Sequence, residues 1–403
     1  MVIYIIAEHY PNPYKPQFDT EFAHLVRQGH EIQIYVNGKY DSTLHPRVLK
    51  YSLHKKVILY PSLRSLHKFL IRLSINFIKS PLKLTYRSLK IINRKDSIKR
   101  NIIRIARMMI FPINAPDLCY IHNIAAVERI DFLHKIYPKS RMALYYHGGE
   151  VGGEKKNTRD TELFNSMDIV FSNTEFSKNQ AIKRGCDKDI AISLPVAFDL
   201  SDYCILEPKI FKKQNRLSLI SIGRLSEEKG LIYALDAIKM LKDTHDIDLL
   251  YTIVGNGTQE QELKEYTKKQ GLNEIVHFAG ELDKSGVVNK LLESDVLILP
   301  SLITETWAET QAAVVQEAMF CKTLVIATNV GGVPESSASV LHQFSVPVSD
   351  PQAIYKMLAM INNLTSDEYT SISEEAYNFA ISKFDIEKIG PKFIDLVMND
   401  KKL

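Results

Sequence analysis

The feature that most constrains the fold is a regular alternation of short apolar runs with amphipathic helical patterns along the 403 residues. Several runs are continuously apolar, as in strands that are buried on both faces of a parallel sheet. The alternation therefore predicts an α/β architecture with parallel sheets. The expected strands are Val2–Ala7, Glu31–Val36, Val57–Tyr60, Leu118–Ile121, Met142–His147, Ile169–Ser172, Ile190–Leu194, Leu217–Ile222, Leu249–Val254, Val276–Ala279, Val296–Leu299 and Thr323–Ala327.

Helical patterns lie between these runs and end at recognisable signals. Phe18–Gln28 stops at Gly29, Ile232–Lys242 follows Gly230, and Ala312–Phe320 ends before a strand. After position 351 the chain is typical of helices only.

The chain is too long for one ordinary domain. A polar, proline-bearing stretch at Asp202–Arg216 is the favoured boundary, because a new β-α-β series starts at Leu217. We therefore predict two doubly wound, Rossmann-like domains, spanning residues 1–205 and 206–376, which face each other across a cleft. Ligands of such sheets bind at the carboxyl ends of the strands.

Composition excludes several classes of protein. An apolar content of 45% with 24% charged residues is typical of a globular chain. The four scattered cysteines favour neither a disulfide framework nor a zinc site. The first residues are typical of a buried strand and not of a signal peptide, and no run approaches the length of a membrane span. We expect a cytoplasmic protein, at most peripheral to the inner face of the cell membrane.

One candidate site follows an apolar strand at Ser221-Ile-Gly-Arg-Leu-Ser-Glu-Glu-Lys-Gly230. Gly223 lets the backbone pass close to a ligand. Arg224 and Lys229 offer the guanidinium and ammonium groups that a diphosphate requires. The alternative from the residues alone is an exposed loop with ordinary salt bridges.

A second candidate site spans Pro300–Met319, where Glu309 and Glu317 stand eight residues apart. Two carboxylates at the start and inside of a helix could bind sugar hydroxyls, and the helix N-terminus between them could face a phosphate. Acidic residues are also common at such positions without any function, so this spacing alone is weak. Glu305 competes with Glu309 for the sugar-binding role, although its spacing to Glu317 differs.

Six elements in a fixed order carry a family resemblance. They are Gly-Arg-Leu-x-x-Glu-Lys-Gly, Val254-Gly-Asn-Gly257, Val276-His-Phe-Ala-Gly280, Ser-Asp-Val-Leu-Ile-Leu-Pro-Ser, the glutamate pair, and Thr328-Asn-Val-Gly-Gly-Val-Pro-Glu335. Together they resemble the nucleotide-sugar half of the retaining GT-B enzymes of glycosyltransferase family 4 (group 1 glycosyltransferases). The likeness is close over residues 217–335 and thinner in the first half.

The resemblance implies a retaining, metal-independent glycosyltransferase with no cofactor, in which a nucleotide sugar (UDP-sugar favoured) is the donor. Arg224 and Lys229 would bind the diphosphate, Glu317 the ribose and Glu309 the sugar. His147, in Leu144-Tyr-Tyr-His-Gly-Gly-Glu150, would lie beside the donor sugar. The remaining donor-binding candidates are Gly223, Gly255, Thr310, Gln311, Ala312 and Ala313. The final helix, about 377–403, would pack back on the first domain.

Two departures from the family pattern limit what the resemblance implies. Relatives carry Gly-Phe-Gly after the first glutamate, where this chain has Thr310-Gln311-Ala312, so the sugar cannot be inferred. The first loop, 8–13, lacks the glycine pair of many relatives, which leaves the acceptor open. Asp246-Ile-Asp248 has the form of a manganese site, but it precedes a strand and therefore falls at the wrong edge of the sheet. We expect no metal site.

A basic segment separates the charges of the chain. Thirteen basic residues and one acid, Asp96, lie between positions 64 and 107, which gives +12 there and −8 elsewhere. Ile98, Ile102, Ile105 and Met109 share one helical face, so the segment is typical of a basic amphipathic helix at an anionic membrane surface. The alternative is a solvated basic face. No nucleic-acid module surrounds it, so we expect no nucleic acid as partner.

We therefore predict transfer of a sugar to a glycan or lipid-linked acceptor, with a role in cell-surface polysaccharide synthesis. The alternatives are a nucleotide-sugar epimerase of the same fold and a non-catalytic partner that binds glycan or membrane.

Overall fold

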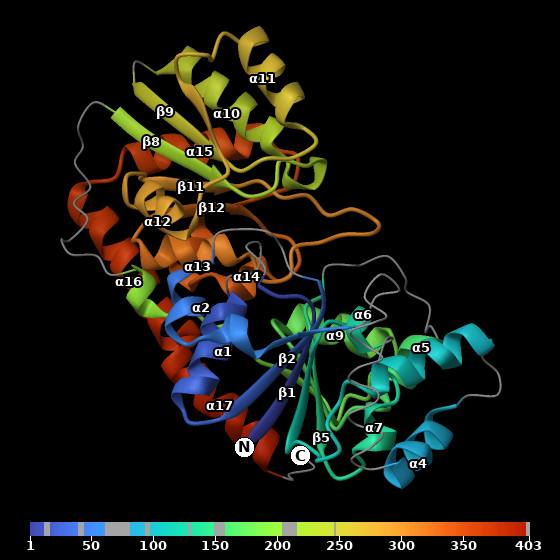
Figure 1. The fold of residues 1–403 in the computed structure, drawn as a ribbon. Helices are drawn as coiled ribbons and strands as arrows, with labels where there is room; N and C mark the ends of the chain where they lie inside the picture. Colours follow the sequence, from blue (N-terminus) through green and yellow to red (C-terminus); the bar gives the residue numbers. More distant parts are fainter. Residues whose placement is uncertain are drawn as a thin grey trace.

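The protein consists of two parallel β-sheets, each covered by helices, in a computed structural model (Figure 1). The structure describes residues 1–11, 17–38, 44–60, 81–92, 97–127, 130–148, 158–203, 216–245 and 247–399. One sheet is formed by the first half of the chain and the other by the second half. The expected α/β class and the GT-B architecture are thereby confirmed.

The first sheet has seven parallel strands in the order β3-β2-β1-β4-β5-β6-β7. Its strand order reverses between β1 and β4, and the carboxyl ends at that point form a crevice in doubly wound sheets. The strands are β1 (Val2–His9), β2 (Glu31–Gly38), β3 (Val57–Leu59), β4 (Leu118–His122), β5 (Arg141–Tyr146), β6 (Ile169–Ser172) and β7 (Ala191–Ser193).

The second sheet has six parallel strands in the order β10-β9-β8-β11-β12-β13, with its reversal between β8 and β11. The strands are β8 (Arg216–Ile222), β9 (Asp248–Val254), β10 (Val276–Gly280), β11 (Val296–Leu299), β12 (Leu324–Thr328) and β13 (Ser345–Val346). All twelve expected strands are confirmed within one or two residues at each end. The two-residue β13 was not predicted, since a pair of residues carries no periodic pattern.

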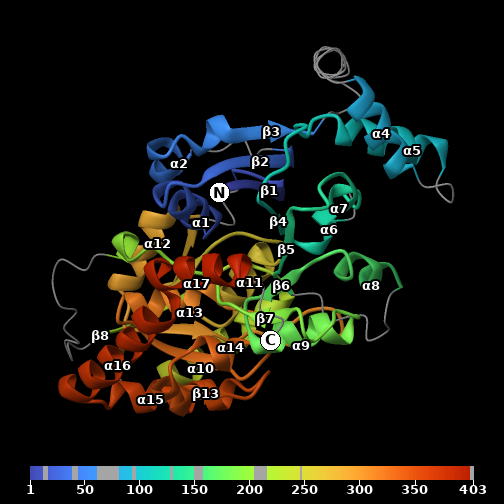
Figure 2. The same ribbon diagram turned by 90° about the horizontal axis from the view of Figure 1, so that it is seen from below.

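Helices cover both faces of each sheet (Figures 1 and 2). The first domain contains α1 (Gln17–Arg27), α2 (Pro46–Lys50), α4 (Pro81–Ile91), α5 (Ile98–Met108), α6 (Ile124–Val127), α7 (Leu133–Ile136), α8 (Thr158–Phe164) and α9 (Glu175–Lys183). The second contains α10 (Leu231–Thr244), α11 (Glu260–Lys269), α12 (Lys284–Leu292), α13 (Ala313–Phe320), α14 (Val333–Ser336) and α15 (Pro351–Asn362). Two long helices, α16 (Ser366–Phe384) and α17 (Ile386–Met398), follow.

The expected helix boundaries have clear physical causes. The helix α1 ends before Gly29, which adopts a φ of +81° that closes the helix with a hydrogen bond from its amide to the carbonyl of Val26. The helix α10 follows Gly230, at a φ of +62°. A Cβ atom at Gly230 would lie 2.2 Å from the carbonyl oxygen of Pro300, so this turn requires glycine for both backbone angle and space.

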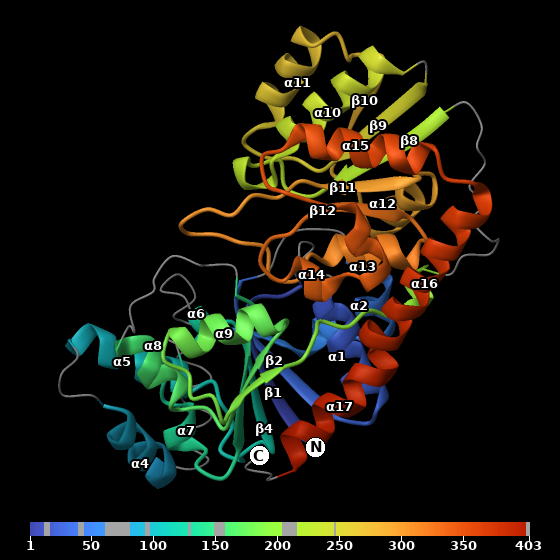
Figure 3. The ribbon, with the colours of Figure 1, turned by 180° about the vertical axis from the view of Figure 1, so that it is seen from behind.

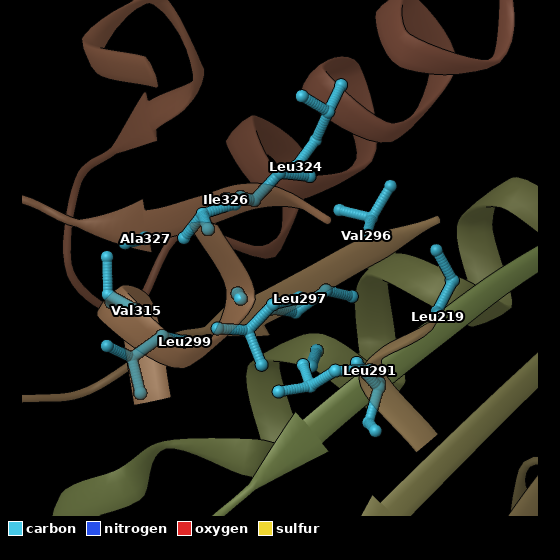
Figure 4. Packing of buried hydrophobic residues seen from close by; sticks show 14 of the residues in the cluster. Leu219, Leu291, Val296, Leu297, Leu299, Val315, Leu324, Ile326 and Ala327 are labelled. Carbon is cyan, nitrogen blue, oxygen red and sulfur yellow. The ribbon is translucent and has the colours of Figure 1, made fainter. Parts of the chain in front are cut away.

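The central strands of each sheet are buried on both faces, as their continuous apolar runs predict. In the second domain, β11 and β12 pack against α13 through Leu299, Ile326 and Val315, all of which are fully or almost fully buried (Figure 4). Burial of this core stabilises the sheet edge from which the loops of the candidate site start.

The C-terminal helices cross from the second domain to the first (Figure 3). The helix α16 packs against the second domain, and the chain turns at Asp385, which pairs with Phe198 as an isolated bridge. The helix α17 then covers the first sheet, where the ring of Phe393 lies 4.7 Å from that of Tyr120. The domain boundary expected at 205–206 falls outside the described residues.

The basic segment is arranged differently from the sequence pattern. In α4 the side chain of Arg87 is buried, and its guanidinium donates to the carbonyls of Pro112 and Ile113. In α5 the expected apolar face is split, because Ile105 and Met109 pack on the core whereas Ile98 and Ile102 are exposed. Residues 64–80 and 93–96 of this segment lie outside the described part.

Candidate active site between the two domains

A cavity of about 350 Å³ lies between the two domains, at the carboxyl end of the second sheet. Its second-domain wall contains Gly223 and Lys229, after β8, and the start of α13. Its first-domain wall comes from α1, α2 and the chain after β7. Seven of the eleven residues that the sequence predicts for the site line this cavity: Gly223, Lys229, Glu309, Gln311, Ala312, Ala313 and Glu317.

The first charged pair in the cavity joins Lys229 to Glu309. The ammonium group of Lys229 contacts the Glu309 carboxylate, which also accepts a hydrogen bond of 3.0 Å from the Ser301 hydroxyl. The same ammonium group lies 4.8 Å from the centre of the Trp307 ring, within range of a cation–π interaction. Glu309 is only 8% exposed, so its carboxylate needs these partners to offset the loss of hydration. Glu305, the competing carboxylate, is exposed and does not line the cavity.

A second charged pair, which also lines this cavity, joins Lys284 to Glu317. Lys284 opens α12, while Glu317 lies inside α13, and their charged groups are in contact. The hydroxyl of Tyr203 donates to Glu317 over 3.2 Å, and the Lys284 ammonium lies 4.2 Å from the Tyr203 ring centre. Burial, followed by the negative charge of Glu317, raises the pKa of Tyr203 well above its usual range.

Two other predicted site residues, Arg224 and Gly255, lie near the cavity without lining it. Arg224 is exposed and borders a smaller hollow that it shares with Gly223 and Lys229. Gly255 lies behind Gly223: a Cβ atom there would be 1.9 Å from the Gly223 carbonyl oxygen. Gly255 therefore serves the close packing of two strand ends.

His147 lies just after β5, on the first-domain side. The position that follows it, Gly148, has a φ of +67°, and a Cβ atom there would lie 2.7 Å from the Thr310 side chain. His147 is thus adjacent to the loop that carries Glu309. It lines a smaller cavity of about 30 Å³, whose walls include Glu21 and His24.

The ring of His147 also meets other titratable groups of the first domain. Its Nε2 is 3.4 Å from Nδ1 of His122, and Nε2 of His122 is 3.7 Å from the carboxylate of Glu21. Burial raises the pKa of Glu21 to about 7, although a hydrogen bond from Tyr120 acts to lower it. The Glu21 carboxyl can therefore take up or release a proton near neutral pH.

The first-domain wall contributes a cation that the sequence analysis did not identify. Arg47, at the start of α2, forms a forked pair with Asp202 at 2.6 and 3.1 Å and contacts Asp199 at 3.0 Å. Burial acts to lower the pKa of Arg47, but the hydrogen bond and charge of Asp202 outweigh it and the pKa is raised. Arg47 and Lys284 were missed because no motif surrounds them, although Lys284 follows the carboxyl end of a predicted strand.

The described ranges contain no candidate metal site, because no three His, Cys, Asp or Glu side chains in them gather around a common point. Asp248 begins β9 at the amino edge of the sheet, where its carboxylate lies 3.7 Å from Arg216. Asp246 lies outside the described residues. Within the same described ranges, no helix combines the length and apolar character needed to cross a bilayer.

Comparison with known proteins shows what the chain resembles. Residues 205–379 match the family model described as "Glycosyl transferases group 1". The "Putative colanic acid biosynthesis glycosyltransferase WcaL" of Escherichia coli (strain K12) is 25% identical over 266 residues, which is 64% of either chain. The amylovoran biosynthesis glycosyltransferase AmsK of Erwinia amylovora is 28% identical over 169 residues, 40% of this chain and 41% of that one. The chain thus spans under two thirds of these relatives' own length.

Solved structures share the whole fold at low identity. Anabaena Alr3699/HepE, in a crystal structure with UDP-glucose, gives a TM-score of 0.70 at 16% identity over 99% of either chain. Sucrose-phosphate synthase from Thermosynechococcus elongatus gives 0.71 at 14% identity, over 99% of this chain and 98% of that one. Residues 205–379, which include the second sheet and its wall of the cavity, therefore resemble the group 1 glycosyltransferases, within a chain that has a two-domain GT-B fold.

Proposed function

We propose that the protein is a retaining, metal-independent glycosyltransferase that moves a sugar from a nucleotide-sugar donor to a glycan or lipid-linked acceptor in cell-surface polysaccharide synthesis. The observation that carries this proposal is the pair of lysine–glutamate contacts, Lys229–Glu309 and Lys284–Glu317, on the second-domain wall of one interdomain cavity. A nucleotide sugar has an anionic diphosphate in its middle and a hydroxyl-bearing ring at each end. The second-domain wall offers lysines that suit the diphosphate and carboxylates that suit the two rings.

The donor is expected to lie along the second-domain wall. Lys229 and the exposed guanidinium of Arg224 would contact the diphosphate, beside the amide groups at the start of α13. Glu317 would accept hydrogen bonds from the ribose, and Glu309 from the sugar. UDP is favoured as the nucleotide because Anabaena Alr3699/HepE, which shares the fold, has been crystallised with UDP and with UDP-glucose.

The chemistry of transfer requires that negative charge on the departing diphosphate be stabilised. Lys229 and Arg224 can supply this stabilisation as fixed cations, which is the basis for proposing that no metal is needed. His147, next to Thr310, would contact the donor sugar at the reacting carbon. Retention of anomeric configuration is proposed from the ordered motifs that resemble the retaining GT-B enzymes.

A lipid-linked acceptor would be met at a membrane, and the outer face of α4 is suited to one. Leu82, Tyr86 and Leu89 are 85%, 60% and 67% exposed there, whereas Arg87 points inward. Lys83 and Lys90 flank these side chains and border a cavity of about 250 Å³. Exposed apolar side chains framed by lysines match the interface of an anionic bilayer, so we propose that this helix docks on the inner face of the cell membrane.

Vesicle flotation tests the membrane part. We expect binding to vesicles of phosphatidylglycerol and phosphatidylcholine but not to phosphatidylcholine alone, and about tenfold weaker binding for Leu82→Gln/Leu89→Gln. Leu49→Gln, at a 53% exposed leucine in α2, is the matched control. Equal binding of the double variant and the control would contradict this assignment.

The products of the reaction test the enzymatic part. Purified protein incubated with UDP-glucose, other nucleotide sugars and a lipid-diphosphate-linked sugar acceptor should release nucleotide diphosphate and extend the acceptor with the donor's anomeric configuration. An epimerase would instead change the sugar without extending the acceptor. A non-catalytic partner would leave every donor intact, and either outcome would overturn the proposal.

A further inference from the structure

The segment 310–311, where the chain departs from the family pattern, makes its contacts with the opposite domain. The amide side chain of Gln311 accepts a hydrogen bond of 2.8 Å from the backbone N–H of Val196 and donates one of 3.2 Å to the Val196 carbonyl. The backbone N–H and the carbonyl of Val196, which follows β7, are thus both hydrogen-bonded by one side chain from the second domain. Such a two-point contact fixes orientation as well as distance.

Thr310 makes a second contact with the first domain. Its hydroxyl accepts a hydrogen bond of 3.1 Å from the amide side chain of Asn173, which is 6% exposed and follows β6. The same Asn173 amide lies 3.4 Å from the carbonyl of His147. One buried side chain therefore joins the backbone of His147 to the loop that carries Glu309.

The loop also has little room to shift against its own domain. A Cβ atom at Gly332 would lie 1.8 Å from the Thr310 carbonyl oxygen, and one at Gly331 would lie 1.9 Å from that of Glu309. The loop is thus held between two closely packed glycines of the second domain and the two hydrogen-bonding residues of the first. Glu309 is the residue next to this contact, and its carboxylate meets Lys229.

We propose that Gln311 is a positioning residue that tethers the two domains, so that His147 and Glu309 are held on either side of the donor sugar. This inference rests on the proposed function, and it gives the Thr-Gln pair a role that does not require contact with the sugar. Thr310 and Asn173 form the second half of the same tether. Loss of Gln311 should loosen the interdomain contact before it weakens either domain, because its partners lie outside its own domain's core.

Amide hydrogen exchange tests the tether without any substrate. The Val196 N–H should exchange about tenfold faster in Gln311→Ala than in the wild-type protein, since its acceptor is lost. Gln343→Ala is the matched control, because Gln343 is exposed and bonds only a neighbouring carbonyl of its own domain. Unchanged exchange at Val196 would overturn the tether.

Turnover tests the positioning role. Gln311→Ala should lower kcat about tenfold with little change in the KM of the donor, because the diphosphate contacts remain while the alignment of the two walls is lost. Gln311→Glu should fall similarly, since a carboxylate cannot donate to the Val196 carbonyl. Faster exchange with unchanged kcat would overturn the positioning role. A wild-type protein without turnover would overturn the proposed function and with it the positioning role, whereas the tether would still be decided by the exchange at Val196.

Discussion

The buried carboxylates of the two domains are held in different ways. In the second domain, Glu309 and Glu317 each contact a lysine at the cavity wall. In the first domain, Asp19 and Glu21 lie on α1 with no lysine partner among the described residues, and burial raises the pKa of both to about 7. The second domain therefore presents lysine–glutamate pairs, whose cations suit an anionic donor, whereas the first contains two carboxyl groups that can take up or release protons near neutral pH.

The largest effect on turnover is expected at the lysine–glutamate pairs of the second domain. Lys229→Ala should lower turnover by about 10²–10³-fold, because it removes a cation that stabilises the leaving diphosphate. Initial rates at saturating donor check this. Lys239→Ala is the matched control, since Lys239 pairs with Asp243 on the outside of the same domain. If Lys229→Ala and Lys239→Ala turned over at similar rates, the cavity lysine would have no special role in turnover. The contrast drawn between the two domains would then fail.

A pH-dependent effect is expected in the first domain. Asp19 is 5% exposed, and burial raises its pKa from 3.8 to about 7, against the opposing effects of Tyr10 and Arg47. The folded state therefore holds a proton that the unfolded state has lost between about pH 4 and 7. Over that window the wild-type protein loses stability relative to Asp19→Asn as pH rises, by about 2 kcal/mol after allowance for screening.

Chemical denaturation at pH 4.5 and pH 7.5 measures this difference in the free energy of unfolding. Asp243→Asn, on the surface of the second domain, should show no such pH-dependent gain. A difference between the wild-type protein and Asp19→Asn that stays constant with pH would show that Asp19 is ionised in the folded protein.

A smaller effect is expected for binding alone. Glu317→Gln keeps the shape of the side chain but removes the charged acceptor, so UDP should bind about tenfold more weakly. Calorimetric titration with UDP measures this change. Glu374→Gln, at an exposed position of α16, is the control and should bind UDP like the wild-type protein. Unchanged UDP affinity in Glu317→Gln would show that the Lys284–Glu317 pair does not contribute to donor binding.

The smallest effect on binding is expected on the first-domain side. His147→Ala should leave UDP affinity unchanged and lower turnover by about tenfold, since its proposed contact is with the sugar at the reacting carbon. Comparison of UDP titrations with initial rates checks this split. An equal loss in both quantities would place His147 among the residues that bind the nucleotide.

The same contrast explains what the sequence could predict. The buried parallel strands were recognisable because their apolar runs are continuous. Gly230, before α10, marks a turn that no other residue fits. The second-domain site was recognisable because its residues lie in contiguous motifs that begin at strand ends. Arg47 and Lys284 could not be identified in this way, because only the packing of α2 and α12 brings them to the cavity.

The basic segment shows a different limit. In α4 the side chain of Arg87 is buried against the carbonyls of Pro112 and Ile113, while Leu82 and Leu89 are exposed, which the number of basic residues in the segment does not indicate. A helical pattern gives the angular positions of the side chains and not the direction of the core. An arginine with two carbonyl acceptors can be buried at less cost than its charge suggests.

The most direct test of the central claim is turnover of a nucleotide sugar by the purified protein with and without a chelator. We expect release of nucleotide diphosphate and extension of the acceptor at the same rate in EDTA as in added Mg²⁺ or Mn²⁺, with loss of both in Lys229→Ala. Transfer that requires an added divalent cation, or that persists at the wild-type rate in Lys229→Ala, would contradict the account.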